Sequence, residues 1–194
     1  LKLFSVAMND GGNASSCDCR ACTLFAERTS YTDLYLDALN ELADGTFQRI
    51  IPDHVAIKKP RKILLCTGKI YYELLRKRDE GKHTDVALIR IEQLYPFPGE
   101  PLAARLARMP NLEEVVWCQE EPKNNGSWFF VEPYIEECLA DAGVKPDRAR
   151  YAGRKASAST ATGLMKRHQA EQAALISHAL GHSVRAEIRR QRKG

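Results

Sequence analysis

Short apolar runs alternate with helical patterns over most of this chain, and that alternation predicts its fold. Apolar runs at residues 63–66, 86–91 and 114–118 predict buried strands, and residues 148–152 predict a fourth strand. Apolar residues at helical spacing predict helices near 69–77, 100–108, 129–140 and 162–180. Such alternation implies right-handed crossovers between parallel strands. We therefore predict a three-layer α/β/α fold with a mainly parallel sheet of about five strands.

The regular pattern occupies only part of the chain, so the sequence predicts four segments of different character. Residues 1–40 are irregular, and residues 41–60 form a connector with an Asp44-Gly45 turn signal and breakers at Pro52 and Pro60. Residues 61–181 form the predicted α/β domain. Residues 182–194 form a basic tail.

The net charge of +4 comes entirely from the tail, which has five basic residues and one acidic residue. The rest of the chain holds 24 basic and 24 acidic residues. That balance argues against nucleic-acid binding, because such a surface needs clustered cations. No apolar run reaches the roughly 18–20 residues needed to span a bilayer, and no secretory signal is recognisable. We expect neither nucleic acid nor membrane as a partner.

The six cysteines fall into two groups. Cys66, Cys118 and Cys138 lie inside apolar patterns, where reduced cysteine behaves as a small hydrophobic residue, and this indicates a reducing compartment. The other three lie close together, in the pattern Cys17-x-Cys19-x2-Cys22. Structural zinc needs four ligands, usually as two spaced pairs, and no second pair follows. We therefore predict no metal site.

Polar residues follow two of the apolar runs, at the edge of the sheet where ligands and partners bind in open α/β folds. Arg90 and Gln93 follow the second run, and Gln119, Glu120 and Glu121 follow the third. Adjacent carboxylates on an extended segment point in opposite directions, so Glu120 and Glu121 do not form an acid–base dyad. We interpret them as contacts to a loop or partner, and we assign no catalytic residue.

Two segments could bind an anion. Lys69 opens a helix directly after a strand, although a tight strand-to-helix turn is the favoured interpretation. Before the last helix, cations and hydroxyls gather in the residues Arg154, Lys155, Ser157, Ser159 and Thr160. Ser159 or Thr160 is expected to be the helix N-cap, and the same segment could cradle a phosphate. Arg90 would add a third cation if it faced the same crevice. We expect His168, on the apolar stripe of this helix with Leu164, to be a packed, hydrogen-bonded histidine.

Several stretches of this region resemble the C-terminal domain of the E1 component of 2-oxoglutarate dehydrogenase. They are ELADGTFQRII (41–51), LLCTGKIYYELLRKR (64–78), DVALIRIEQLYPFP (85–98), VVWCQEEPKNNGSW (115–128), RYAGRKASASTATG (150–163) and MKRHQAEQAALISHALG (165–181). The resemblance implies a transketolase C-terminal-like fold within a homodimer. It implies an enzyme that uses thiamine diphosphate and magnesium to decarboxylate 2-oxoglutarate and passes a succinyl group to the lipoyl domain of an E2 component. Some members bind AMP or acetyl-CoA as a regulator, which fits the Arg154/Ser157 cradle.

The resemblance also predicts what this chain lacks. The domains that bind thiamine diphosphate are expected upstream of residue 1, so the chain alone is predicted to be inactive and not to bind the cofactor. Asp10 and Asn40 match the magnesium motif only loosely. Residues 1–40 do not resemble the family and the tail runs beyond its usual end, as expected of a truncated, frame-disrupted or fused gene product.

Six residues of this region are assigned framework or interface roles: Gln93, Gln119, Glu120, Glu121, Asn125 and Trp128. Two alternatives remain open. One is a stand-alone module that binds an adenine nucleotide or acyl-CoA, and the other is the E1 of the related 2-oxoadipate dehydrogenase. The expected location is the cytoplasm of a bacterium or the mitochondrial matrix.

Overall fold

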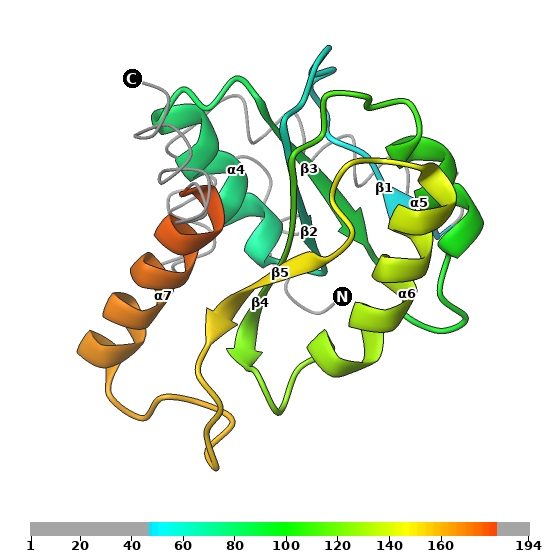
Figure 1. Ribbon diagram of the computed structural model, residues 1–194. Helices are drawn as coiled ribbons and strands as arrows, with labels where there is room; N and C mark the ends of the chain where they lie inside the picture. The colour runs from blue at the N-terminus through cyan, green and yellow to red at the C-terminus, as the bar shows by residue number, and fades with distance from the viewer. Residues whose placement is uncertain (1–46, 182–194) are drawn as a thin grey trace, which may run out of the picture. The chain divides into compact units, whose positions relative to one another are not determined.

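A five-stranded sheet with helices on both faces forms the described part of the chain, which confirms the α/β prediction (Figure 1). The computed structural model describes residues 47–181. The elements in chain order are β1 (Ile50–Ile51), β2 (Lys62–Cys66), α4 (Ile70–Glu80), β3 (Val86–Ile91), α5 (Gly99–Leu106), β4 (Glu114–Pro122), α6 (Trp128–Ala142), β5 (Ala149–Arg154) and α7 (Met165–Leu180). All four predicted strands and all four predicted helices are present.

The strand order is β1-β3-β2-β4-β5. The four longer strands run parallel, with Leu64 of β2 opposite both Leu88 of β3 and Val116 of β4. At one edge β1 pairs antiparallel with β3, with Ile50 opposite Ile91. The sequence prediction missed β1, which lies in the expected connector, because two residues are too short to show a strand periodicity.

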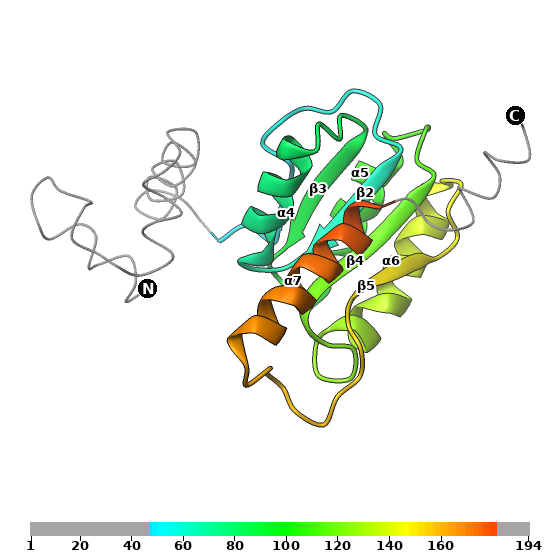
Figure 2. The ribbon, with the colours of Figure 1, turned by 90° about the vertical axis from the view of Figure 1, so that its left-hand side faces the viewer.

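The sheet is buried on both faces. Helices α4 and α7 cover one face, and α5 and α6 cover the other (Figures 1 and 2). Every residue of β2 is buried, although Lys62 begins the strand. Alternate strand residues, such as Ile63 and Leu65, pack in a cluster with Leu102 of α5 and Ile135 of α6. A strand that is covered on both sides needs apolar residues at successive positions, which explains the continuous apolar runs in the sequence.

Helix α7 begins later than predicted. Leu164 occupies its N-cap position and makes no side-chain cap hydrogen bond, so the expectation of a Ser159 or Thr160 cap is wrong. The Ser159 hydroxyl instead donates to the Ala161 carbonyl at 2.6 Å, inside the preceding loop. Leu164 is also 73% exposed, because the buried stripe of α7 starts only at Gln172.

The three cysteines of the described region are free and buried, as predicted. Burial raises the pKa of Cys118 to about 12 and that of Cys138 to about 11, and it raises the pKa of Cys66 well above its ordinary value. Such thiols are poor nucleophiles, because the thiolate is the reactive form. Within residues 47–181, no helix combines the length and the apolar character required to cross a membrane.

Candidate functional site

The carboxyl edge of the parallel strands carries most of the residues singled out from the sequence. Helices α4, α6 and α7 begin there, because each follows a parallel strand. The β4–α6 loop and the β5–α7 loop also lie at this edge (Figure 1). The contacts made here decide whether the edge is an open binding site or a closed framework.

Gln119 is the centre of this edge. Its side chain is buried, and Oε1 accepts from Trp117 Nε1 at 2.9 Å and from the Trp128 backbone N–H at 3.0 Å. Its Nε2 donates to the carbonyls of Glu121 at 3.3 Å and Pro122 at 3.2 Å. One amide therefore ties the end of β4 to the first residue of α6. These contacts fit the framework role predicted for Gln119.

Trp128 belongs to the same framework. It is 3% exposed and packs against Tyr151 of β5, with ring centroids 5.4 Å apart. Burial raises the pKa of Tyr151 to about 12, so its hydroxyl stays protonated and donates to the Arg154 carbonyl at 2.8 Å. A side chain buried to this degree offers no surface to another subunit.

Two asparagines tie the loops together. The side-chain amides of Asn124 and Asn125 donate to the Ser157 carbonyl at 3.0 and 3.1 Å. In return the Ser157 backbone N–H donates to Asn124 Oδ1 at 2.9 Å. The β4–α6 loop and the segment after β5 are therefore joined by hydrogen bonds. Sequence reasoning singled out Asn125 and Ser157 separately, and only the structure shows that they are partners.

Glu120 and Glu121 diverge as predicted for adjacent residues of a strand. Glu121 is exposed, whereas Glu120 is partly buried. Glu120 Oε1 accepts from Lys69 Nζ at 3.0 Å and from Gln172 Nε2 at 2.9 Å. The same Gln172 amide reaches Glu73 of α4 at 3.1 Å. Glu120 therefore links β4 to both helices on that face, and Lys69 is occupied by it.

Arg90 is held at the other side of the edge. Its guanidinium lies over the Tyr71 ring, 4.3 Å from the centroid, and Nη1 is 3.8 Å from Glu92 Oε1. Burial raises the pKa of Tyr71 to about 12. Glu92 also accepts from the Gly68 backbone N–H at 3.4 Å, in the turn where Gly68 has a φ of +69°. These contacts favour the tight-turn interpretation of residues 66–69. Gln93, in the next loop, donates to the Pro96 carbonyl at 2.7 Å.

Arg154 is paired with α7. Its Nη2 lies 2.8 Å from His168 Nδ1, and its Nε lies 3.6 Å from Glu171 Oε2. A guanidinium only donates, so His168 Nδ1 accepts. This confirms that the histidine is hydrogen-bonded, although its ring is only partly buried. Hydrogen bonds from Thr162 and Arg167 lower the pKa of Glu171. The sequence analysis did not single out Glu171. The available signal was its position three residues after His168, because residues with this spacing are neighbours on the surface of a helix.

The structure does not bring the proposed anion-binding residues together. Arg90 lies near the end of β3 and Arg154 ends β5, three strand spacings apart, which places their backbones at least about 14 Å from each other. Arg90, Arg154 and Lys69 each face a carboxylate. Lys155 and Ser159 are exposed on the loop before α7.

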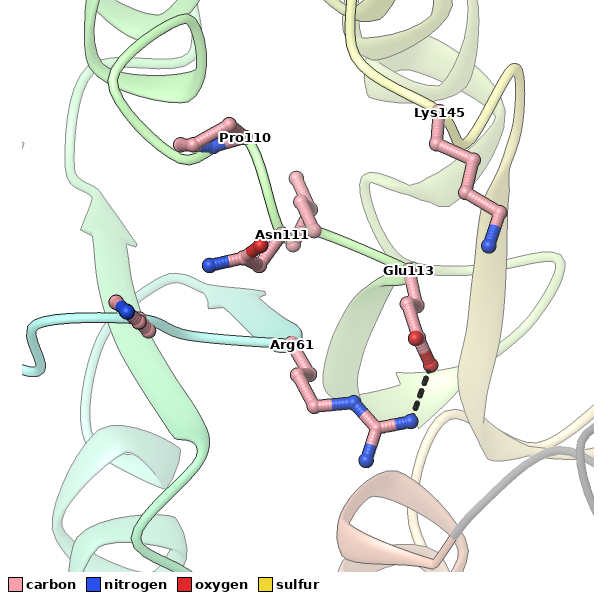
Figure 3. Close-up of a pocket in the computed structure, with 7 residues that line it drawn as sticks. Arg61, Pro110, Asn111, Glu113 and Lys145 are labelled. Carbon is pink, nitrogen blue, oxygen red and sulfur yellow. Dashed lines mark hydrogen bonds and ion pairs between the residues drawn. The ribbon is translucent and has the colours of Figure 1, made fainter.

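Two hollows in the described region lie away from this edge. One, of about 400 Å³, lies at the opposite edge of the sheet and is lined by Lys59, Arg61, Pro110, Asn111, Leu112, Glu113 and Lys145 (Figure 3). The other, of about 550 Å³, lies between α5 and α6, where Phe97 stacks on Tyr134 with centroids 5.2 Å apart. No group of three or more potential metal ligands occurs within residues 47–181. Cys17, Cys19, Cys22, Asp10 and Asn40 lie outside the described residues.

Comparison with known proteins gives consistent matches. Residues 37–180 match the family model "2-oxoglutarate dehydrogenase C-terminal". The "2-oxoglutarate dehydrogenase E1 component" of Cupriavidus necator is 46% identical over 143 residues, which are 73% of this chain and 15% of the relative. The proteins of the same name from Brucella anthropi and Brucella ovis are 45% and 52% identical, and the matches cover 76% and 75% of this chain and 16% of each relative.

A solved structure described as "Split gene transketolase, inactive beta4 tetramer" aligns with 71% of this chain and 43% of its own chain, at 16% identity and a TM-score of 0.45. The family model covers most of the chain, and the sequence relatives agree with it in name and in the region matched. The chain therefore belongs to the 2-oxoglutarate dehydrogenase C-terminal family.

Proposed function

We propose that this chain supplies the C-terminal assembly domain of the E1 component of a 2-oxoglutarate dehydrogenase. The parent enzyme would bind thiamine diphosphate and magnesium, decarboxylate 2-oxoglutarate and transfer a succinyl group to a lipoyl-bearing E2 component, in the cytoplasm or the mitochondrial matrix. In that enzyme the domain would pack within an E1 homodimer. The chain spans 15–16% of the relatives' length, so these activities belong to the longer protein.

The observation that carries this proposal is the closed carboxyl edge. The polar residues at the strand ends bond to one another: Gln119 to the start of α6, Glu120 to Lys69 and Gln172, and Arg154 to α7. A substrate-binding edge would instead leave such groups facing a cavity. These contacts support a rigid domain that positions other parts of the enzyme and contributes no reacting group of its own.

A complementation experiment tests the proposal. A chimera would join the Cupriavidus necator E1, cut before its matching region, to residues 48–181 of this chain. We expect turnover of 2-oxoglutarate with thiamine diphosphate, magnesium and an artificial electron acceptor from the chimera, and none from the full chain alone. A soluble chimera without turnover, or turnover by the chain alone, would contradict the proposal.

A pair of variants in the chimera tests whether residues of the carboxyl edge serve assembly or take part in the reaction. Gln119→Leu should reduce the yield of assembled enzyme, because the Trp117 and Trp128 N–H groups lose their buried acceptor. Glu121→Gln is the matched control, since Glu121 is exposed. We expect the control to leave turnover per assembled enzyme unchanged. A large loss in that control would assign Glu121 a role in the reaction.

We further propose that any adenine-containing regulator, such as AMP or acetyl-CoA, binds beside the Arg154–Ser159 segment. Lys155 is its exposed cation, whereas Arg154 is engaged with Glu171. Calorimetry of the full chain with AMP and with acetyl-CoA is the direct test, and Lys155→Ala should weaken binding several-fold. Binding that this substitution leaves unchanged would refute the location, and no binding of either ligand would refute the regulator.

A further inference from the structure

The 400 Å³ pocket at the amino edge of the sheet has the opposite character to the closed carboxyl edge. Figure 3 shows the side chains of Arg61, Asn111, Glu113 and Lys145 around one hollow. They come from three separate connections: the entry to β2, the α5–β4 turn and the α6–β5 loop. Its volume falls within the range of small-molecule sites.

The backbone of the pocket is fixed by hydrogen bonds. The Arg61 carbonyl accepts from the N–H groups of Glu113 and Glu114 at 2.8 and 3.1 Å, and the Arg61 N–H donates to the Asp85 carbonyl at 2.9 Å. Leu112 is 1% exposed and anchors the turn in the core. The charged side chains therefore project from a preformed support, which lowers the ordering cost of binding.

The charge of the lining is unbalanced. Arg61, Lys59 and Lys145 are cationic, and Glu113 is the single acidic lining residue. Glu113 pairs with Arg61, whose Nη2 donates to Oε2 at 2.6 Å. Neither lysine forms an ion pair with another residue of the range 47–181. The lining thus carries two more positive than negative charges, on flexible ammonium groups that suit clustered anionic oxygens.

We propose that this pocket binds a small polyanion, a molecule with two or more adjacent phosphate or carboxylate groups. The two lysines would supply the charge, and the Arg61 guanidinium and the Asn111 amide would supply directed hydrogen bonds. Glu113 would oppose binding and disfavour ligands with a single charge. The proposal concerns this chain's own surface and does not depend on the activity of the longer enzyme.

The experiment is isothermal titration of the full chain at low salt with pyrophosphate, with a tricarboxylate and with monovalent acetate. We expect binding of the polyvalent anions, no measurable binding of acetate, and weakening on addition of salt. The two polyvalent probes separate a phosphate site from a carboxylate site. Failure of both to bind would overturn the proposal.

Variants locate the site. A charge about 4 Å from a ligand in water contributes about fivefold in affinity, so Lys59→Ala with Lys145→Ala should weaken binding at least about tenfold. Lys77→Ala with Lys166→Ala, which removes two exposed lysines of α4 and α7, is the matched control. Glu113→Gln should tighten binding about fivefold, a gain that a damaged fold would not produce. Equal effects of both lysine pairs, or weaker binding by the Glu113 variant, would refute the pocket.

Discussion

At the scale of single residues, one buried lysine joins the last helix to the sheet. Lys62, at the start of β2, is 2% exposed. Its ammonium lies 2.9 Å from Glu114 Oε2 and donates to the carbonyls of Leu180 at 3.2 Å, Ala179 at 3.4 Å and Gly181. A cation at this position neutralises the negative end of the α7 dipole and satisfies carbonyls that have no partner within the helix.

Replacing this lysine should therefore loosen α7 from the sheet. We expect Lys62→Met to lower the free energy of unfolding by about 3 kcal/mol, because the partly buried Glu114 carboxylate keeps only Arg150 as a partner and several carbonyls lose their donor. Urea denaturation of the full chain measures the change. The same substitution at exposed Lys59 is the control and should change stability by less than about 0.5 kcal/mol. Equal losses at the two positions would contradict this role.

His178, near the same end of α7, should make stability depend on pH. Burial, and next the charge of Arg150, lower its pKa below the ordinary 6.5. Arg150 Nη1 lies 2.9 Å from His178 Nε2, which accepts the hydrogen bond and so carries no proton. Because the unfolded ring binds a proton more readily, acid favours unfolding, and stability should fall as the pH decreases below about 6.5.

The check is the free energy of unfolding measured from about pH 7.5 to pH 5.5, a range above most carboxylate titrations. His178→Gln keeps a hydrogen-bonding side chain without a titratable group, so its stability should depend less on pH than that of the unchanged chain. An identical pH dependence in the two proteins would show that His178 does not supply the effect.

At the scale of the elements, the β4–α6 loop passes so close to Gln119 that Gly126 has no room for a side chain. A Cβ on Gly126 would lie 2.1 Å from Gln119 Nε2. Gly126→Ala must therefore displace an amide that holds the end of β4 and the start of α6. We expect a loss of about 1–3 kcal/mol in the free energy of unfolding.

Gly163 supplies the matched control for that substitution. A Cβ there meets no atom within 4 Å, so Gly163→Ala should leave stability unchanged or raise it by up to about 1 kcal/mol. Thermal unfolding of the two variants and the unchanged chain compares them directly. A Gly126 variant as stable as the Gly163 variant would show that Gln119 can move at no cost.

The same elements show how far the sequence predicts this molecule. Apolar runs located β2, β3 and β4 because buried parallel strands need apolar residues on both faces. They did not reveal β1, whose place depends on a partner far along the chain. The site was less predictable still. The predicted fourth strand ended at residue 152, whereas β5 extends to Arg154, and the pairing of Arg154 with Glu171 depends on how α7 packs against the sheet.

At the scale of the whole molecule, large apolar side chains are exposed where α6 and α7 begin. Phe129 is 60% exposed in α6, and Leu164 and Met165 are 73% and 61% exposed at the start of α7. Both helices follow parallel strands, so these residues lie at the carboxyl edge of the sheet. Large apolar side chains exposed at one edge of a sheet are typical of an interaction surface. On the proposed function, other parts of E1 would cover them.

If that edge is an assembly surface, making it polar should change association without changing the fold. We expect the full chain to self-associate as its concentration rises, and Phe129→Ser with Leu164→Ser to reduce that association in sedimentation velocity. Serine is a favourable N-cap residue, so the change at Leu164 does not weaken α7. The melting temperature should therefore stay within a few degrees of the original.

Val55→Ser is the control that distinguishes an effect of this surface from an effect of exposed apolar area in general. Val55 is 48% exposed in the connection from β1 to β2, and its replacement should leave association unchanged. In the chimera, the Phe129/Leu164 variant should lower the fraction of assembled E1, whereas the Val55 variant should not. Equal effects of the two would mean that exposed apolar area alone causes association. Only a selective effect at the carboxyl edge would show that this edge, where the side chains at the strand ends bond to one another, serves to join the domain to the rest of the enzyme.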